Sequence, residues 1–133
     1  MCLNLKDYSV IETATEDIVC YKYLHQRIKV DNKLGCLRTP YKHSVVKIGN
    51  TYKSKWVLNN NTIDRSSYIT KGLHSFAILH DCMNDANSWA FTNNKTVLVK
   101  CVIPKGSCYY VGEFGGDKSY ASDKLVYVEE LKF

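Results

Sequence analysis

The stretch TVLVKCVI, residues 96–103, constrains the fold more than any other part of the chain. It is rich in β-branched residues and almost continuously apolar. Such a run is typical of a central strand that is covered on both faces. Pro104, Lys105 and Gly106 follow at once, and this triplet predicts a turn. The sequence therefore predicts a sheet with residues 96–103 near its centre.

Other segments supply the strands that would flank this one. Residues 17–24, DIVCYKYL, are β-branched and aromatic and alternate with the two-residue period of a strand. Further strands are predicted at residues 27–30, 108–111 and 124–131. Because all of these segments are short and separated by turn residues, we expect strands to dominate the fold.

The connections are predicted from their turn residues. Asp31, Asn32 and Gly35 predict a turn after the second strand, and Gly49-Asn50 predicts another within a loop-rich part, residues 36–58. The polar run at residues 59–67 is the longest predicted loop. A glycine-rich loop is expected at residues 112–123, between the last two strands.

One short helix is predicted after the strand HSFAI. Asp81 is placed to cap its amino terminus, and the end is expected at residues 92–94. Its apolar face follows helical spacing through Cys82, Met83, Ala86, Trp89 and Ala90. The predicted class is α+β, a strand-dominated split or strongly curved sheet with one or two short helices. Residues 1–133 are expected to form a single domain, with residues 1–16 as an arm or edge element.

The composition favours an ordinary globular protein of the cytoplasm. The chain of 133 residues has no apolar run of eighteen residues, and its first residues do not resemble a signal peptide. The six cysteines are therefore predicted to be reduced thiols rather than disulfides. They lack paired C-x-x-C spacing, so neither a metal site nor a cofactor is predicted.

Positive charge is concentrated in one segment of a chain whose net charge is +5. Residues 22–55 contain nine lysines and arginines and a single acid, Asp31; tyrosines occur among them, and Trp56 follows directly. This pattern favours an anionic ligand that carries a stackable ring. A solvated basic face over core aromatics explains it equally well.

Several polar residues are candidates for contacting such a ligand. His74 and Ser75 could bond a phosphate or a ribose hydroxyl, or could simply belong to the entry into the helix. Ser119 to Lys124 could turn hydroxyls and amides toward an anion, or could form a plain hairpin. Because Tyr109 and Tyr110 point to opposite faces of a strand, one belongs to the core and the other could line a pocket. The predicted ligand-binding residues are Tyr41, Lys42, His74, Ser75, Lys105, Tyr110, Tyr120, Ser122 and Lys124.

A set of short motifs carries a resemblance to a known group of proteins. The motifs are TPY at 39–41, GNTYKS at 49–54, GLHSF at 72–76, IPKGSCYY at 103–110 and YASDKL at 120–125. In this order they resemble small, poorly characterised proteins of phages and gut bacteria. The resemblance covers most of the chain after residue 17 and implies no settled activity.

The order of strands, helix and long apolar strand also resembles compact ADP-ribosyltransferase domains. That resemblance implies an NAD clamp, with His25 after the first strand, Ser75 on a middle strand and Glu113 as the late acid. Glu113 lacks the acid or glutamine that such enzymes place two residues earlier, where this chain has Val111. No G-x-S-x-G elbow, P-loop or dinucleotide fingerprint occurs either. Turnover is therefore not expected.

Three functions remain open at this level. The first is a phage-derived protein that binds an anionic, nucleotide-like ligand and sequesters a nucleotide immune signal in the host cytoplasm. The second is an enzyme of ADP-ribosyl transfer or nucleotide cleavage. The third is a protein-interaction module, such as an inhibitor, with tyrosines as interface anchors. A host protein is a candidate partner, a homo-oligomer is compatible with the sequence, and no membrane is implied.

Overall fold

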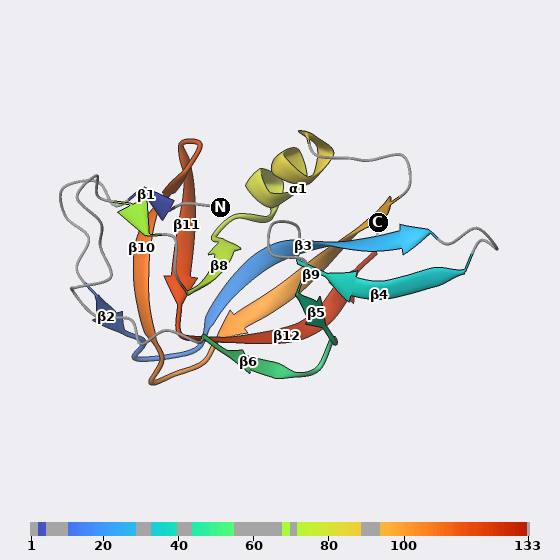
Figure 1. The fold of residues 1–133 in the computed structure, drawn as a ribbon. Coiled ribbons are helices and arrows are strands. Elements are labelled where there is room, and N and C mark those ends of the chain that lie inside the picture. The colour runs from blue at the N-terminus through green and yellow to red at the C-terminus, as the bar shows by residue number, and fades with distance from the viewer. Residues whose placement is uncertain are drawn as a thin grey trace.

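The computed structural model describes residues 3–4, 11–28, 33–39, 44–54, 68–69, 72–88 and 94–132, and every structural statement below concerns these residues. Their backbone forms one strongly curled antiparallel sheet with a single helix against it (Figure 1). The prediction of a strand-dominated, curved α+β fold is confirmed at this level.

Strand β9 (Asn94–Ile103) lies between β3 (Ile18–Ile28) and β12 (Lys124–Leu131), as its apolar sequence predicts. Both neighbours run antiparallel to it. The buried side chains of β9 are Val97, Val99, Cys101 and Ile103, and those between them are half-buried. One face of the strand is therefore fully covered and the other only in part, which corrects the expectation of coverage on both faces.

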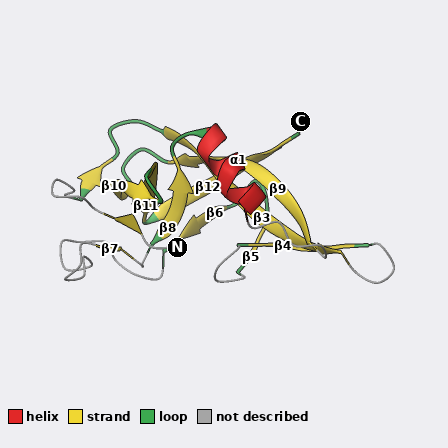
Figure 2. Cartoon of the chain, turned by 90° about the horizontal axis from the view of Figure 1, so that it is seen from above, coloured by secondary structure: helices red, strands yellow, loops and turns green. Residues whose placement is uncertain are grey.

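The sheet continues from β3 through a single pairing, Tyr21 with Phe76, into β8 (Leu73–Phe76), β11 (Asp117–Ser122) and β10 (Cys108–Phe114). Two short strands pair with β10, namely β1 (Leu3–Asn4) and β2 (Glu12–Thr13). A third, β7 (Tyr68–Ile69), pairs with β1. Figures 1 and 2 show that β8, β10 and β11 run steeply across the direction of β3, β9 and β12. The described strands of residues 1–16 thus lie at this border of the sheet, β1 between β10 and β7 and β2 beside β10.

Two predicted boundaries on the other side of the sheet are wrong. Arg27 and Ile28 do not begin a second strand, because β3 continues through them. Gly35 is not in a turn, since it lies inside β4 (Leu34–Arg38), the partner of β3 in a long hairpin. The short strands β5 (Val45–Val46) and β6 (Thr51–Lys53) follow, and Gly49 with a φ of 97° makes the predicted turn between them. Residues 59–67 lie outside the described chain.

The predicted glycine-rich loop at 112–123 is also wrong. Strand β10 runs to Phe114, β11 begins at Asp117, and only Gly115 and Gly116 turn between them. Both glycines have positive φ values, 59° and 90°, which two-residue hairpin turns require and which L side chains rarely adopt. The two glycines form a tight hairpin turn, so the residues SYAS, which were expected in a loop, belong to strand β11.

Helix α1 (Leu79–Ser88) begins two residues before Asp81, so Asp81 lies in its first turn and is not its cap. It is described as far as Ser88, and of the predicted end at residues 92–94 only Asn94 is described, as the first residue of β9. Cys82 and Ala86 pack on Tyr23 and Phe76. The hydroxyl of Tyr23 donates a hydrogen bond of 2.7 Å to Asp85 Oδ2, which ties the helix to the sheet. Trp89 and Ala90 lie outside the described residues.

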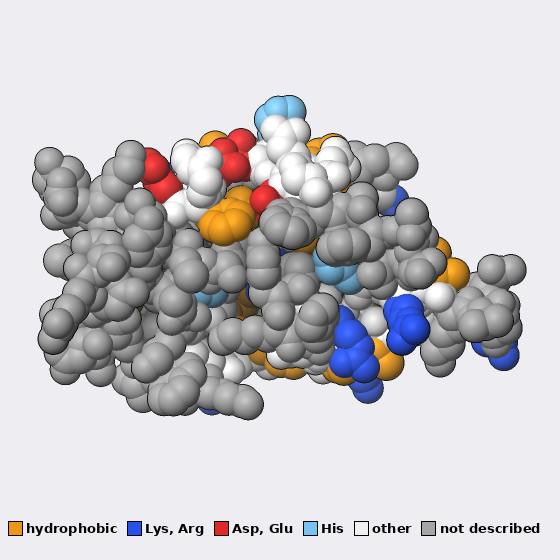
Figure 3. Space-filling view, turned by 45° about the horizontal axis from the view of Figure 1, so that its top comes forward, with side chains coloured by type: hydrophobic (Ala, Val, Ile, Leu, Met, Phe, Trp, Pro, Cys, Tyr) orange, Lys and Arg blue, Asp and Glu red, His pale blue; other side chains and the backbone are white. Residues whose placement is uncertain are grey.

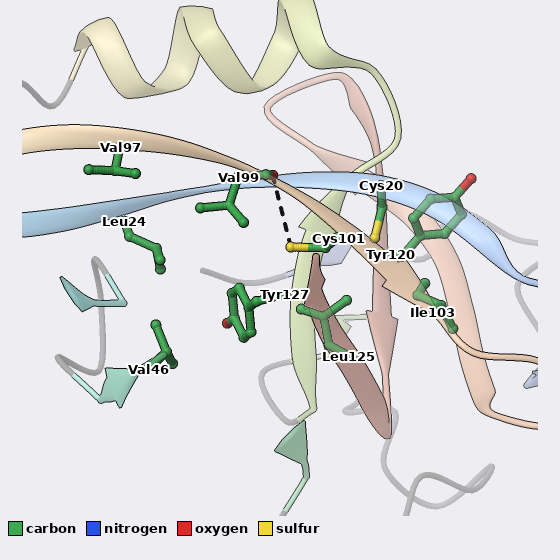
Figure 4. Packing of buried hydrophobic residues seen from close by; sticks show 10 residues of the cluster. All are labelled: Cys20, Leu24, Val46, Val97, Val99, Cys101, Ile103, Tyr120, Leu125 and Tyr127. Atoms are coloured by element: carbon green, nitrogen blue, oxygen red, sulfur yellow. Dashed lines mark hydrogen bonds between the residues drawn. The ribbon is translucent and has the colours of Figure 1, made fainter. Parts of the chain in front are cut away.

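The sheet has two faces that recur below. We call core face the side that carries Cys20, Val99 and Cys101, and outer face the side that carries Tyr21, Tyr23 and Phe76 and is partly covered by α1. Figure 4 shows the core side chains converging between the curled strands, with the thiol of Cys101 3.9 Å from the carbonyl oxygen of Val99. Among the described residues, no helix is long and apolar enough to cross a membrane.

Candidate functional site

His74 and Ser75, the two residues expected at the mouth of a pocket, lie inside β8 and are buried. His74 pairs with Ala121 and Ser75 pairs with Tyr120, so the two side chains point to opposite faces of the sheet. His74 is 8% exposed, which matches the alternative of a structural histidine. The two residues therefore do not face one common ligand.

Ser75 faces the core, where its buried hydroxyl has no hydrogen-bond partner among the described residues. Burial raises the pKa of Cys20 to about 11, and the charge of Lys22 limits that rise. Burial likewise raises the pKa of Cys82 to about 12 and raises that of Cys101. These thiols therefore stay protonated at neutral pH, and the described cysteines form no disulfide with one another. Within the described chain no cluster of three metal-ligating side chains occurs.

The serines of the predicted anion-binding loop form hydrogen bonds with the backbone of their own part of the chain. The hydroxyl of Ser122 donates to the carbonyl oxygen of Lys124 at 2.9 Å. The hydroxyl of Ser119 donates to the carbonyl oxygen of Asp117 at 3.1 Å. Tyr120 is 8% exposed on the core face, with the Lys118 ammonium 5.9 Å from its ring centroid. Because these hydroxyls bond their own backbone, they do not form a cradle for an anion.

The alternation of Tyr109 and Tyr110 is confirmed, but their roles are reversed from the prediction. Tyr110 is fully buried, whereas Tyr109 is half-buried and packs edge to face on Tyr120 at 6.0 Å between ring centroids. Loss of solvent and then a hydrogen bond with the Glu12 carboxylate raise the pKa of Tyr109 to about 12. Tyr109, which the prediction left out of the site, is thus the accessible ring of the pair.

The three residues carried over from the transferase resemblance do not meet on one face. Ser75 pairs with Tyr120 and Tyr120 with Val111, so Glu113, two residues further along β10, shares the core face with Ser75. His25 lies within β3, not after it, and its ring packs on Tyr23 at 5.7 Å on the outer face. A strand places alternate side chains on opposite faces, and His25 falls on the wrong side for the clamp that the resemblance implies.

Two of the predicted lysines do come together, at the edge where β6 and β9 end and β12 begins (Figure 1). Lys124 is the first residue of β12, and Lys105 follows the end of β9 by two residues. Lys53, which the prediction missed, ends β6 and pairs directly with Lys124. We call Lys53, Lys105 and Lys124 the lysine edge.

The pairing of Lys53 with Lys124 is unusual within this sheet. In the described register, two other pairs of charged residues stand directly opposite each other, Glu113 with Lys118 and Lys100 with Glu129, and both have opposite signs. Opposed side chains in an antiparallel pair have Cβ atoms about 5 Å apart, so like charges repel. Tyr52 and Leu125, the adjacent pair, pack on the core, so both lysines project from the outer face.

Lys105 is held at the corner of a rigid turn. The amide of Ser107 donates to the carbonyl oxygen of Pro104 at 3.0 Å, and Gly106 has a φ of 89°, as the third position of a type II turn requires. The amide of Gly106 bonds the carbonyl oxygen of Ala14 at 2.8 Å. The amide of Lys105 itself bonds Asp17 Oδ1 at 2.8 Å. The Lys105 side chain therefore leaves from a fixed position.

Asp123 joins the three strands that meet at the lysine edge. Its carbonyl oxygen accepts the amide of Ser54 at 2.7 Å, just after Lys53. Its Oδ1 accepts the amide of Cys108 at 3.0 Å, and its own amide donates to the carbonyl oxygen of Cys108. The carboxylates of Asp17 and Asp123 are thus both engaged by backbone amides. Between described residues, no ion pair neutralises any of the three lysines.

The charges of the molecule are segregated on a larger scale as well. Strands β3 to β6 contain no described acid, whereas α1 and the start of β11 contain Asp81, Asp85 and Asp117. Burial, and then the nearness of Asp81 and Asp85, raise the pKa of Asp117. In Figure 3 the acidic side chains gather near the helix and the basic ones on the side of β4. An anion would be repelled at the first region and attracted at the second.

Tyr41 and Lys42, the remaining predicted contacts, lie outside the described residues. The lysine edge therefore contains two of the nine predicted ligand-binding residues, and Lys53 could not have been added without knowing the strand pairing. We compared the chain with protein-family models, with curated proteins and with solved structures, and none of them matches it.

Proposed function

We propose that this protein binds an anionic, nucleotide-like ligand and that the lysine edge holds its phosphate groups. The observation that carries the proposal is the direct opposition of Lys53 and Lys124 on adjacent strands. A bound phosphate between two ammonium groups would turn their repulsion into two charge-assisted hydrogen bonds. Lys105, on its fixed turn at the same edge, would supply a third.

The backbone around these residues supports a preorganised site. Hydrogen bonds through Asp123 hold the end of β6 against the start of β12 and β10. A ligand that finds its cations already in place loses less entropy on binding than one that must order a loop. The lysine edge is also continuous with the acid-free region of β3 to β6, which would attract an anion from a distance.

A binding role fits these residues better than catalysis does. ADP-ribosyl transfer or nucleotide cleavage by the carried-over set would need His25 and Ser75 on one face, and they lie on opposite faces. The purpose of sequestering a nucleotide immune signal in the host, and an origin in phage, rest on the resemblance of the sequence motifs alone. A transferase-like fold stays a hypothesis on the same basis.

The proposal is tested by titrating the protein with ATP, NAD, a cyclic dinucleotide and pyrophosphate in a calorimeter. The site variant is Lys53→Gln with Lys124→Gln. The matched control is Lys95→Gln with Lys132→Gln, which removes the same charge from exposed positions elsewhere. We expect the site variant to lose at least about tenfold in affinity for the anion that binds best, and the control less than about twofold.

Two results would contradict the proposal. Equal losses in the two double variants would mean that overall charge attracts the anion and that the lysine edge is not its site. No binding of any of the four compounds by the unmodified protein at low ionic strength would remove the function itself. Binding should also weaken as salt is raised, because exposed charges are screened.

A further inference from the structure

The hairpin of β3 and β4 extends away from the rest of the molecule (Figure 1). It presents exposed apolar side chains. Ile28 and Leu34 are 39% and 49% exposed and lie directly opposite each other. Val45, at 46%, lies opposite Arg38 on the adjoining strand β5. Three aliphatic side chains thus stay in water on three consecutive strands, where burial by a partner would be favourable.

Cations surround these side chains. Arg27 precedes Ile28, Lys33 precedes Leu34, and Arg38 pairs with Val45. All three are exposed, and no acid occurs among the described residues of β3 to β6. An aliphatic patch within a cluster of like charges is complementary to a segment that alternates apolar and acidic residues.

The backbone offers a place for such a segment. Strand β5 pairs with β4 only at Leu37 and Arg38. On that side of Leu34–Cys36 no other described strand is paired. An edge strand with open amides and carbonyl groups can accept a further strand from another chain.

We propose that the edge of β4 is a docking surface for an extended, acidic segment of a partner protein, which adds to the sheet beside Leu34–Cys36. Its apolar side chains would cover Leu34 and Val45 on one face of the added strand, and its carboxylates would point to the other face, where Lys33 lies. Nucleic acid is a poorer fit for this surface, because the exposed side chains are aliphatic and offer no ring for base stacking. This surface is separate from the lysine edge, and either can exist without the other.

The test uses a fluorescent synthetic peptide of eight alternating glutamate and valine residues and measures its binding by anisotropy. Val45→Glu places an acid in the proposed surface and should weaken binding by about tenfold or more. Val19→Glu is the matched control, because Val19 is the same residue type, is 44% exposed and lies at the other end of β3. That control should change the affinity by less than about twofold.

Three further experiments distinguish this proposal from its alternatives. The Lys53→Gln, Lys124→Gln protein should bind the peptide like the unmodified protein, so failure of the lysine edge leaves this inference intact. In the unmodified protein, the peptide should slow hydrogen exchange at the amides of Leu34 and Cys36, which does not depend on whether a variant folds. A peptide methylated on alternate backbone nitrogens should bind much more weakly.

The proposal is overturned if Val45→Glu and Val19→Glu behave alike and the exchange at β4 does not change. It is also overturned in favour of nucleic acid if a single-stranded oligonucleotide binds at β4 more tightly than the peptide does. If the protein forms a dimer that Val45→Glu dissociates and Val19→Glu does not, the occupant is a second copy of this chain and not an acidic partner.

Discussion

The two ends of β12 differ in the signs of the charged residues that stand opposite each other across the sheet. Near its carboxyl end Glu129 stands opposite Lys100, and at its amino end Lys124 stands opposite Lys53. Both pairs project from the outer face of the same sheet, but the pair at the carboxyl end has opposite charges and the pair at the amino end has like charges. Cross-strand pairs of opposite charge stabilise a sheet and like pairs destabilise it. The proposed binding of an anion at the amino end would account for this difference.

The first prediction tests whether both ends belong to one rigid sheet, and it has the largest expected effect. Cys101 pairs with Tyr127 between the two ends and is fully buried, whereas Cys36 on the projecting hairpin is exposed. Alkylation of Cys101 should need opening of the core and should be slower than that of Cys36 by several orders of magnitude. Mass spectrometry of partly alkylated protein would give both rates. Comparable rates would mean that the sheet opens locally and that its charge pairs cannot be compared.

The second prediction concerns the support beneath the lysine edge. Ile103 is completely buried just before the turn that carries Lys105, while Val102 beside it points to the outer face and is half-buried. Ile103→Ala should lower the free energy of unfolding by about 2 to 5 kcal/mol, since it leaves a cavity in the core. Val102→Ala should lower it by less. Denaturant unfolding measures both, and similar losses would contradict the assignment of the two faces.

The third prediction concerns Asp123, which joins β6, β10 and β12. Asp123→Ala removes the acceptor of the Cys108 amide and should lower the free energy of unfolding by about 1 to 3 kcal/mol. It should also weaken anion binding, even though it removes a negative charge, because the side-chain bond that fixes the start of β12, and with it Lys124, against β10 would be lost. Stronger anion binding by Asp123→Ala would mean that charge alone, and not position, determines the affinity.

The strand at the centre of the sheet could be predicted from the sequence because its signal is local. The alternation in β3, β9 and β12 and the turn at Pro104 to Gly106 each depend on neighbouring residues. The strand boundaries near Arg27 and Gly35 could not be predicted, because β3 and β4 extend into a hairpin whose length the local pattern does not limit. Nor could the turn at Gly115 and Gly116, which needs two positive φ values that a glycine pair permits but does not require.

The candidate site was less predictable than the fold, for a physical reason. Residues 53 and 124 are neighbours only through strand pairing, and no local pattern contains that pairing. Lys124 was predicted as part of a glycine-flanked polar cluster, Lys105 was predicted only as a member of the ligand-binding set, and the sheet happens to bring them to one edge. His74 and Ser75 were chosen as adjacent polar residues, but adjacency on a strand sends two side chains to opposite faces. Tyr109 and Tyr110 illustrate the same limit, because alternation separates them without saying which of the two is buried.

The smallest expected change in stability is also the most direct test of the account. Lys53→Gln should raise the free energy of unfolding by a few tenths up to about 1 kcal/mol, because it relieves the repulsion at Lys124. The same substitution should weaken nucleotide binding. Lys100→Gln is the matched control, since it should lower the stability by a similar amount and leave binding unchanged.

The decisive measurement is therefore one pair of values on Lys53→Gln, its free energy of unfolding without ligand and its affinity for the anion that the unmodified protein binds best. The account predicts opposite signs, with stability rising and affinity falling. A Lys53→Gln protein that is less stable than the unmodified one, or that binds the anion equally well, would contradict the claim that this lysine pair is kept for a ligand.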